Sequence, residues 1–282
     1  TLQQDAASQG FVMPPIWPDG NLSLAVVIPF RQQLPLQNRG PHLEQLVARL
    51  HEMLARLAEA GWLRRWRLLV VEQAPDARQF NRGALLNAGF DFLDRSEERF
   101  DQVVFHDADL LPDSENTEVW YTAQPPAAHI IHLTAEGYKK YEGAKRTAGT
   151  APGVVLQRWS DFKQSNGFPL DVWGWAEGLE DRVWFDRLGV YGMRYYPCPI
   201  GAWRDLDGVD FAKSLQALEK PELYCDYRWL SCHKPEMLAR LKALDGSSGP
   251  AAPDELLAWL EDRKGGLDTP DFYRVLREEP CL

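Results

Sequence analysis

Residues 102–109 read Gln-Val-Val-Phe-His-Asp-Ala-Asp, a short apolar run that leads directly into two carboxylates one residue apart. A run of this length with a polar end is typical of a buried β-strand. Two earlier runs have the same character, residues 23–30, in which Pro29 stops the pattern, and residues 67–72. We therefore predict three buried strands, the third of which spans residues 102–106 and leads directly into Asp107 and Asp109.

Apolar residues at helical spacing separate these strands. Between residues 42 and 60 they recur at intervals of three and four, which predicts an amphipathic helix that ends near Gly61. Residues 80–93 return to the same spacing. Alternation of strands and helices implies a mostly parallel sheet covered by helices, with ligands bound beyond the carboxyl ends of the strands. The predicted fold class is therefore α/β.

Composition is that of an ordinary globular protein. Of the 282 residues, 45% are hydrophobic and 26% are charged, so the chain can bury one large core or two small ones. The 41 acidic residues outnumber the 31 lysines and arginines, which gives a formal net charge of −10. A broad nucleic-acid surface needs a basic stripe that displaces counterions from phosphates. We therefore expect no nucleic-acid partner.

The sequence shows no signal for membrane insertion. It has no run of about 18 apolar residues, and residues 1–11 lack the charged-then-apolar pattern of a signal peptide. Four cysteines without a Cys-x-x-Cys pair predict neither a disulfide framework nor a zinc site. We expect no membrane span and a cytoplasmic location, although an upstream anchor could have been removed, because the first residue is Thr1.

The remaining segments divide the chain. Residues 112–152 are rich in Gly, Pro and polar residues and predict loops with short elements. Helical spacing returns near the C-terminus at residues 211–218, 235–244 and 254–263. We accordingly predict three parts, which are an N-terminal arm at residues 1–22, a main domain at residues 23–205 and a helical C-terminal extension at residues 206–282.

Two pairs of carboxylates could carry chemistry. Asp107 and Asp109 offer hard oxygen ligands to Mg²⁺ or Mn²⁺; the alternative is a turn in which both side chains bond their own backbone. Glu180 and Asp181 follow a Trp-rich stretch and could supply a general base for a sugar hydroxyl. They could equally provide favourable charge at a helix N-terminus.

Two further features are found in sites that bind phosphates and in sites that bind sugars. Arg31, Arg39 and Arg82 stand near predicted strand ends or helix starts, where a guanidinium group matches phosphate oxygens. Scattered arginines are otherwise typical of a solvated surface. The chain also has 11 tryptophans, several of them beside Gly and acidic residues, as in sites that stack sugar rings.

Five segments in one order resemble the beta-1,4-galactosyltransferase family. They are Val27-Ile-Pro-Phe-Arg31 with Asn38-Arg39, Glu72-Gln73, Phe80-Asn-Arg82 with Leu85-Leu86-Asn87, Val104-Phe-His-Asp-Ala-Asp-Leu110, and Asn166-Gly-Phe-Pro169 with Trp173-Gly-Trp175 and Glu180-Asp181. The resemblance covers about residues 24–195. It implies the GT-A fold and inverting, metal-dependent transfer of galactose from UDP-galactose to a sugar hydroxyl of a glycan acceptor.

The resemblance also implies roles for single residues. Asp181 is expected to be the catalytic base, with Glu180 beside it, and both are expected to bind the acceptor together with Trp175. Asp109 is expected to hold Mn²⁺, or Mg²⁺ in its place. The expected donor-binding residues are Pro29, Phe30, Arg31, Arg39, Phe80, Arg82, Asp107 and Trp175.

The chain departs from the family pattern at several places. Residues 32–37 are inserted between Arg31 and Asn38, and residues 176–179 lengthen the Trp-rich turn by two residues. The Met-x-x-His or His-x-His metal segment of the family is absent from residues 201–207. The candidates for the third metal ligand are Asp205, Asp207 and His233, and of these we predict His233.

Alternative interpretations of the donor sugar and of the activity remain. The same scaffold could use UDP-GalNAc or UDP-GlcNAc as donor, and Tyr141 is a weak hint about that choice. A non-catalytic carbohydrate- or nucleotide-binding module would have kept the aromatic residues and lost a competent metal site. The expected cytoplasmic location is that of a bacterial-type enzyme, whereas animal relatives of the family act in the Golgi lumen behind a membrane anchor.

Overall fold

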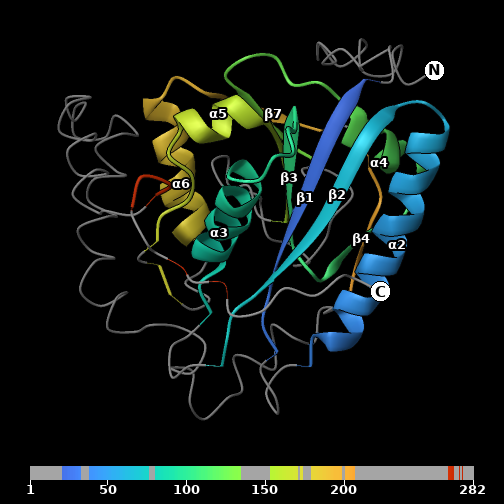
Figure 1. Cartoon of the computed structure of the whole chain (residues 1–282), viewed down its shortest axis with the longest axis horizontal. Coiled ribbons are helices and arrows are strands. Elements are labelled where there is room, and N and C mark those ends of the chain that lie inside the picture. Colours follow the sequence, from blue (N-terminus) through green and yellow to red (C-terminus); the bar gives the residue numbers. More distant parts are fainter. Residues whose placement is uncertain are drawn as a thin grey trace, which may run out of the picture.

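The computed structural model describes residues 21–32, 38–75, 80–134, 153–170, 172–173, 179–198, 201–206, 266–269, 273 and 275. Their centre is a six-stranded sheet in the order β2-β1-β3-β6-β5-β7 (Figure 1). Its strands are β1 (Leu22–Phe30), β2 (Leu63–Glu72), β3 (Gln102–His106), β5 (His129–His132), β6 (Val154–Arg158) and β7 (Arg194–Pro197). A separate two-stranded ladder pairs β4 (Leu110–Pro112) with β8 (Trp203–Asp205).

The central sheet is mostly parallel. β1 runs parallel to both of its neighbours, β2 and β3, and β5 runs parallel to β7. β6 pairs antiparallel with β3 and with β5, so it is the reversed strand of this sheet. The predicted α/β class with a mostly parallel sheet is confirmed. Since β1, β2 and β3 point the same way, their carboxyl ends meet at one edge.

Helices cover both faces of the sheet (Figure 1). On one face lies α2 (Gly40–Glu59), and on the other lie α3 (Arg82–Asp94), α5 (Trp159–Gln164) and α6 (Leu179–Val190). Alternate residues of β1 explain this division, because successive side chains of a strand point to opposite faces. Leu24 and Val26 pack with the leucines of α2, whereas Ala25 and Val27 pack with α3 and α6.

The local elements agree with the apolar periodicity. The strand predicted at residues 102–106 has these bounds, and the helices predicted at 42–60 and 80–93 are Gly40–Glu59 and Arg82–Asp94. β2 begins at Leu63, four residues before the predicted strand, and the prediction missed this first part because Arg and Trp side chains interrupt its apolar pattern. β2 is an edge strand and residues 67–72 are half-buried or exposed, so the prediction that they are buried is wrong. The short elements expected within residues 112–152 include α4 (Glu115–Val119), the 3-10 helix η1 (Trp120–Thr122) and β5.

The described residues cover only part of what the sequence predicts about membranes and cysteines. None of the helices in the described ranges combines the length and the hydropathy that a membrane span requires. Cys198 is buried, and the other three cysteines lie outside the described residues. The three helices predicted beyond residue 205 also lie outside them, so the division into domains and the cytoplasmic location stay predictions.

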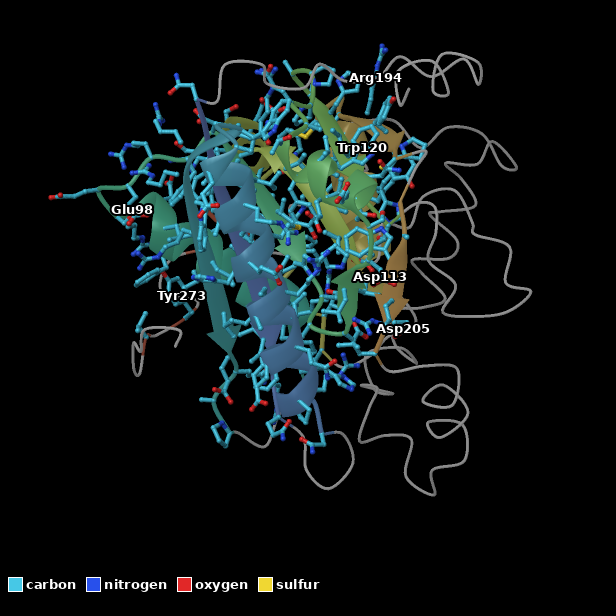
Figure 2. All side chains as sticks on the ribbon, turned by 90° about the vertical axis from the view of Figure 1, so that its right-hand side faces the viewer. Glu98, Asp113, Trp120, Arg194, Asp205 and Tyr273 are labelled. Carbon is cyan, nitrogen blue, oxygen red and sulfur yellow. The ribbon has the colours of Figure 1, made fainter. Side chains whose placement is uncertain are left out.

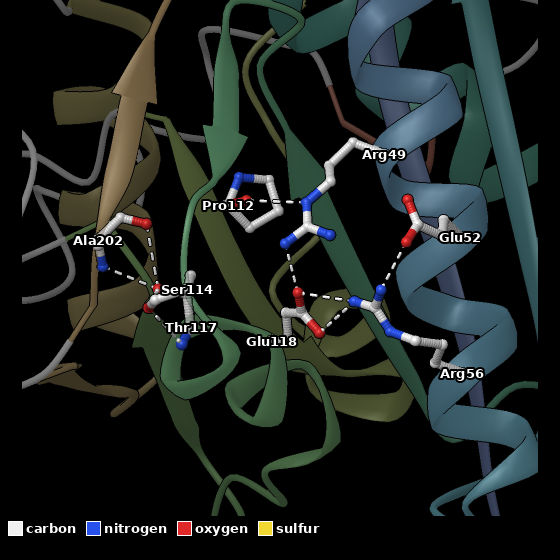
Figure 3. A network of polar contacts seen from close by, with 8 residues as sticks. All are labelled: Arg49, Glu52, Arg56, Pro112, Ser114, Thr117, Glu118 and Ala202. Atoms are coloured by element: carbon white, nitrogen blue, oxygen red, sulfur yellow. Dashed lines mark hydrogen bonds and ion pairs between the residues drawn. The ribbon is translucent and has the colours of Figure 1, made fainter.

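A buried carboxylate fastens α2 to the segment that follows β4 (Figure 3). Glu118, in α4, is only 6% exposed and accepts hydrogen bonds from the guanidinium groups of both Arg49 and Arg56. The Nε of Arg49 also donates to the carbonyl of Pro112, at 3.1 Å. A carboxylate that is withdrawn from water needs such charged donors. These contacts therefore fix the position of β4 relative to α2.

Candidate active site

The candidate site lies at the edge where β1, β2 and β3 end. Arg31 follows β1, Gln73 follows β2 and Asp107 follows β3. The Gln73 side chain accepts a hydrogen bond from the backbone N–H of Asn81 at 2.9 Å, and the Asn81 side chain caps α3 by accepting from Ala84 N. These two bonds fix the start of α3 at the same edge. Arg82, the first residue of α3, is therefore carried to the end of β3.

Arg82 joins the two pairs of carboxylates that the sequence singles out. Its Nε donates to Oδ1 of Asp107 at 2.6 Å, and its Nη1 donates to Oδ1 of Asp181 at 3.0 Å. The Arg82 side chain is 10% exposed and that of Asp181 is 5% exposed. Little water screens the pair of Arg82 with Asp181, which makes it stronger than a pair on an open surface, whereas the Asp107 side chain is 24% exposed. Residues 99 positions apart in the chain thus form one charged cluster.

Asp109 has an arginine partner of its own. Its Oδ2 lies 3.1 Å from Nη1 of Arg39, and the Asp109 side chain is 5% exposed. Arg39 immediately precedes α2, so the insertion at residues 32–37 does not remove it from this edge of the sheet. Asp107 and Asp109 do lie in a turn, closed by a bond from Leu110 N to the Asp107 carbonyl. Their carboxylates nevertheless face two arginines, which is the arrangement of a charged site.

A buried histidine supports the Asp107 backbone. His106 is fully buried, and burial lowers its pKa to about 4, so the ring is neutral at physiological pH. Its Nδ1 lies 2.9 Å from the Asp107 carbonyl and its Nε2 lies 2.8 Å from the Tyr121 hydroxyl. Because a carbonyl only accepts, Nδ1 carries the proton and Nε2 accepts from Tyr121. Nothing in the local sequence indicated this supporting role.

The segment Asn166-Gly-Phe-Pro169 is a turn to which side chains of both α3 and α6 are hydrogen-bonded. Asn166 and Gly167 both have positive φ, at 58° and 65°. The Asn87 side chain accepts from Phe168 N at 2.9 Å and donates to the Phe168 carbonyl at 2.8 Å. Arg187 of α6 donates to the carbonyls of Asn166 and Gly167. This part of the family-like motif therefore positions α6, which carries Asp181.

Gly167 provides a test of that turn. A Cβ at this position would lie 2.4 Å from Oδ1 of Asn87, in addition to the strain of a positive φ. We expect Gly167→Ala to lower the free energy of unfolding by about 3 kcal/mol, measured by urea denaturation. The matched control is Gly192→Ala, since Gly192 has a φ of 70° and a Cβ added there would meet no atom of the described residues within 4 Å. Its expected loss is about 1 kcal/mol, and equal losses in both variants would contradict the role given to Asn87.

The structure places the other predicted residues less uniformly. Pro29 and Phe30 are buried in β1, and Phe30 belongs to the core shared with α2. Arg31 and Phe80 are half-buried at the same edge. Glu180 lies beside Asp181 in the first turn of α6, so the helix-start interpretation also holds for this pair. Trp175, His233, Asp207 and Tyr141 lie outside the described residues.

One of the three candidates for the third metal ligand comes close to Asp109. In the β4–β8 ladder, Asp205 pairs with Leu110, and the N–H of Leu206 donates to the Asp109 carbonyl at 2.8 Å. Figure 2 shows Asp205 below Asp113, toward the end of the molecule at which α2 begins. The hydroxyl of Thr117 holds the start of β8 through both backbone groups of Ala202. Among the described residues, no group of three or more His, Cys, Asp and Glu side chains forms a complete metal site.

Comparisons of the sequence with known proteins show similarity to glycosyltransferases. Residues 4–123 match a family model described as the N-terminal region of glycosyl transferase group 7. Beta-1,4-galactosyltransferase 7 of Drosophila melanogaster is 30% identical over 171 residues, which are 61% of this chain and 46% of that protein. Beta-1,4-galactosyltransferase 4 of Mus musculus is 32% identical over 223 residues, which are 72% of this chain and 59% of that protein. The chain thus spans about half the length of the curated relatives that it matches.

Solved structures agree as well. A mutant of Drosophila beta-1,4-galactosyltransferase 7 in complex with manganese, UDP-Gal and xylobiose is similar with a TM-score of 0.54 and 25% identity, over 68% of this chain and 74% of that chain. The catalytic domain of the same enzyme with xylobiose gives a TM-score of 0.51 and 27% identity, over 64% and 67% of the two chains. The predicted GT-A fold is confirmed by these matches together with the mostly parallel sheet.

Proposed function

We propose that this chain, which is similar to beta-1,4-galactosyltransferases, is a glycosyltransferase that moves galactose from UDP-galactose to a sugar hydroxyl. The observation that carries the proposal is the position of Arg82, which connects Asp107 on the expected donor side with Asp181, the expected base. A charged cluster of this kind, at the carboxyl ends of parallel strands, is where α/β folds bind their ligands. The Drosophila relative, whose structure holds UDP-Gal and xylobiose, makes galactose the first donor to test.

The proposed reaction is a single displacement at the anomeric carbon. The acceptor oxygen bonds to that carbon while Asp181 takes the proton from the acceptor hydroxyl. The bond to the UDP oxygen breaks on the opposite face, so an alpha-linked donor gives a beta-linked product. Asp181 is 4% exposed, which keeps competing water away from the base. We expect the guanidinium groups of Arg82 and Arg31 to stabilise the additional negative charge that the diphosphate gains when this bond breaks.

Carboxylate oxygens suit a manganese or magnesium ion at this edge. Asp109 would hold the ion, and we propose Asp205 as a second carboxylate ligand, because the β4–β8 ladder places it beside Asp109. Oxygen ligands are the type that Mg²⁺ and Mn²⁺ prefer. When bound, the ion stabilises the negative charge of the departing diphosphate. His233 stays an alternative ligand outside the described residues.

Asp109→Asn tests the metal site. In Mn²⁺ we expect this variant to bind UDP at least tenfold more weakly than the wild type, because a neutral amide is a far weaker ligand for a divalent ion. With a chelator, the variant should bind UDP no more weakly than the wild type. Calorimetric titration of UDP under both conditions measures the difference. Asp113→Asn is the matched control, since Asp113 is exposed next to the same ladder, and a loss in the control equal to that of Asp109→Asn would contradict the assignment.

A transfer assay tests the function as a whole. The protein is incubated with UDP-galactose, Mn²⁺ and a panel of saccharide acceptors, and mass spectrometry detects an added hexose. The anomeric coupling constant of the product, measured by NMR, should show a beta linkage. Faster transfer from UDP-GalNAc or UDP-GlcNAc would move the donor assignment to that sugar. Tight binding of a donor without transfer to any acceptor, or to water, would favour the non-catalytic binding module.

A further inference from the structure

Hydrogen bonds join the first residue of the insertion at residues 32–37 to the residues that follow the insertion. The Gln32 side chain accepts hydrogen bonds from the backbone N–H groups of Arg39 at 2.9 Å and of Gly40 at 3.1 Å. Its Nε2 donates to Oδ1 of Asn38 at 2.7 Å. The first residue of the insertion therefore bonds to the residues that follow the insertion, through both ends of one carboxamide.

This closure also caps α2. The first N–H groups of a helix have no partner within the helix and are normally satisfied by the side chain of the N-cap residue. Arg39 is the N-cap residue of α2, and its side chain makes no capping bond. Gln32 takes over this function from a distance of seven residues. It thereby determines where the backbone of Arg39 lies.

The position of Arg39 matters because its side chain reaches Asp109. The guanidinium Nη1 lies 3.1 Å from the Asp109 carboxylate, which is nearly buried. The body of α2 is held separately, by its packed leucines and by the Arg49 bond to Pro112. The contribution of Gln32 is to fix the backbone at the start of the helix, from which the Arg39 side chain extends.

We propose that Gln32 is a positioning residue, which holds Arg39 on Asp109 until a divalent ion binds the carboxylate and the UDP diphosphate binds the arginine. This inference rests on the proposed function. A cation and an arginine compete for one carboxylate, because both positive charges are stabilised by it and repel each other. The diphosphate gives the displaced guanidinium a new anionic partner. Arg39 thus keeps Asp109 in place before the donor arrives and then contributes to donor binding.

Variants that remove Arg39 or release it from Gln32 should change the affinities for Mn²⁺ and for UDP in opposite directions. Without nucleotide, Arg39→Met should bind Mn²⁺ at least threefold more tightly, since Asp109 no longer has a competing cation. With Mn²⁺ present, the same variant should bind UDP about tenfold more weakly. Gln32→Ala should change both affinities in the same directions by about fivefold or less, since Arg39 is still present but no longer held.

The experiment measures Mn²⁺ binding without nucleotide, and UDP binding in Mn²⁺, by calorimetry of the whole chain. Gln32→Glu should restore both affinities to within about twofold of the wild type, because a carboxylate accepts the same two N–H bonds at a helix N-terminus. Gln45→Ala is the control, since Gln45 is an exposed glutamine of the same helix that donates to the Pro41 carbonyl.

The outcomes separate the two proposals. Equal affinities of Gln32→Ala and Gln45→Ala overturn the role of Gln32. Weaker binding of Mn²⁺ alone in Arg39→Met overturns the exchange of partners. If the wild type binds no UDP in Mn²⁺, the proposed function fails, while the titrations with Mn²⁺ alone still decide whether Gln32 and Arg39 govern access to Asp109.

Discussion

Replacing Asp181 with Asn should abolish sugar transfer and leave UDP binding in Mn²⁺ unchanged. The amide has the size of the carboxylate but does not take a proton from the acceptor hydroxyl. Loss of a general base typically lowers the rate by about 10² to 10⁴-fold. UDP should still bind, since Arg82 keeps its 2.6 Å bond to Asp107 in the variant. The predicted signature is therefore a large loss in kcat with an unchanged affinity for UDP.

Single-turnover transfer and UDP titration measure the two quantities separately. The control is Asp161→Asn, because Asp161 is also a buried carboxylate but bonds the N–H of Ala128, ahead of β5, at the opposite edge of the sheet. This variant should lose stability and keep the turnover number of its folded fraction. If Asp181→Asn loses UDP binding together with transfer, Asp181 is a structural residue or a ligand of the donor, and the proposed base is wrong.

The second large effect is expected for Arg82→Met. Methionine removes the cation between Asp107 and Asp181 and leaves two carboxylates near each other in a poorly solvated place. Breaking a buried ion pair by removal of one partner costs about 3 kcal/mol or more of stability. Transfer should fall at least about 100-fold, and UDP should bind more weakly, since the arginine is also expected to contact the diphosphate.

Arg82→Lys separates charge from geometry. Lysine keeps the positive charge but presents a single ammonium group, which does not reproduce the two bonds of the guanidinium fork. We expect stability near that of the wild type and transfer between those of the wild type and Arg82→Met, from urea denaturation and initial rates. If Arg82→Met keeps wild-type transfer and UDP affinity, the ion pairs of Arg82 serve the fold alone.

The sequence predicts the first half of the fold well because its signals are local. The runs at residues 23–30 and 102–106 and the stripe of α2 each contain the pattern that determines their structure. β5 is different, because it has four residues and becomes a strand through pairing with β6 and β7, which follow much later in the chain. Local periodicity carries no information about such pairing.

The candidate site divides in a similar way. Asp107, Asp109 and Asp181 are recognisable from charge and position, and the resemblance assigns them roles. Their connections are not, because the bond between Arg82 and Asp181 spans 99 residues. Side chains such as Gln32 and Asn87 have no pattern of their own, since each acquires its role from a backbone group that only the folded chain brings near. The segment from Asn166 to Asp181 likewise contains both a residue of the site, Asp181, and the turn at residues 166–169 that supports α6, and the resemblance does not distinguish their roles.

Binding of the donor and its dependence on metal is the central claim, and one calorimetric titration tests it. UDP-galactose, UDP-GalNAc and UDP-GlcNAc are each titrated into the protein with Mn²⁺ and with a chelator. We expect UDP-galactose to bind most tightly and its binding to require the metal. Binding of none of the three donors under either condition, or equal binding with and without metal, would show that the chain is not a metal-dependent galactosyltransferase.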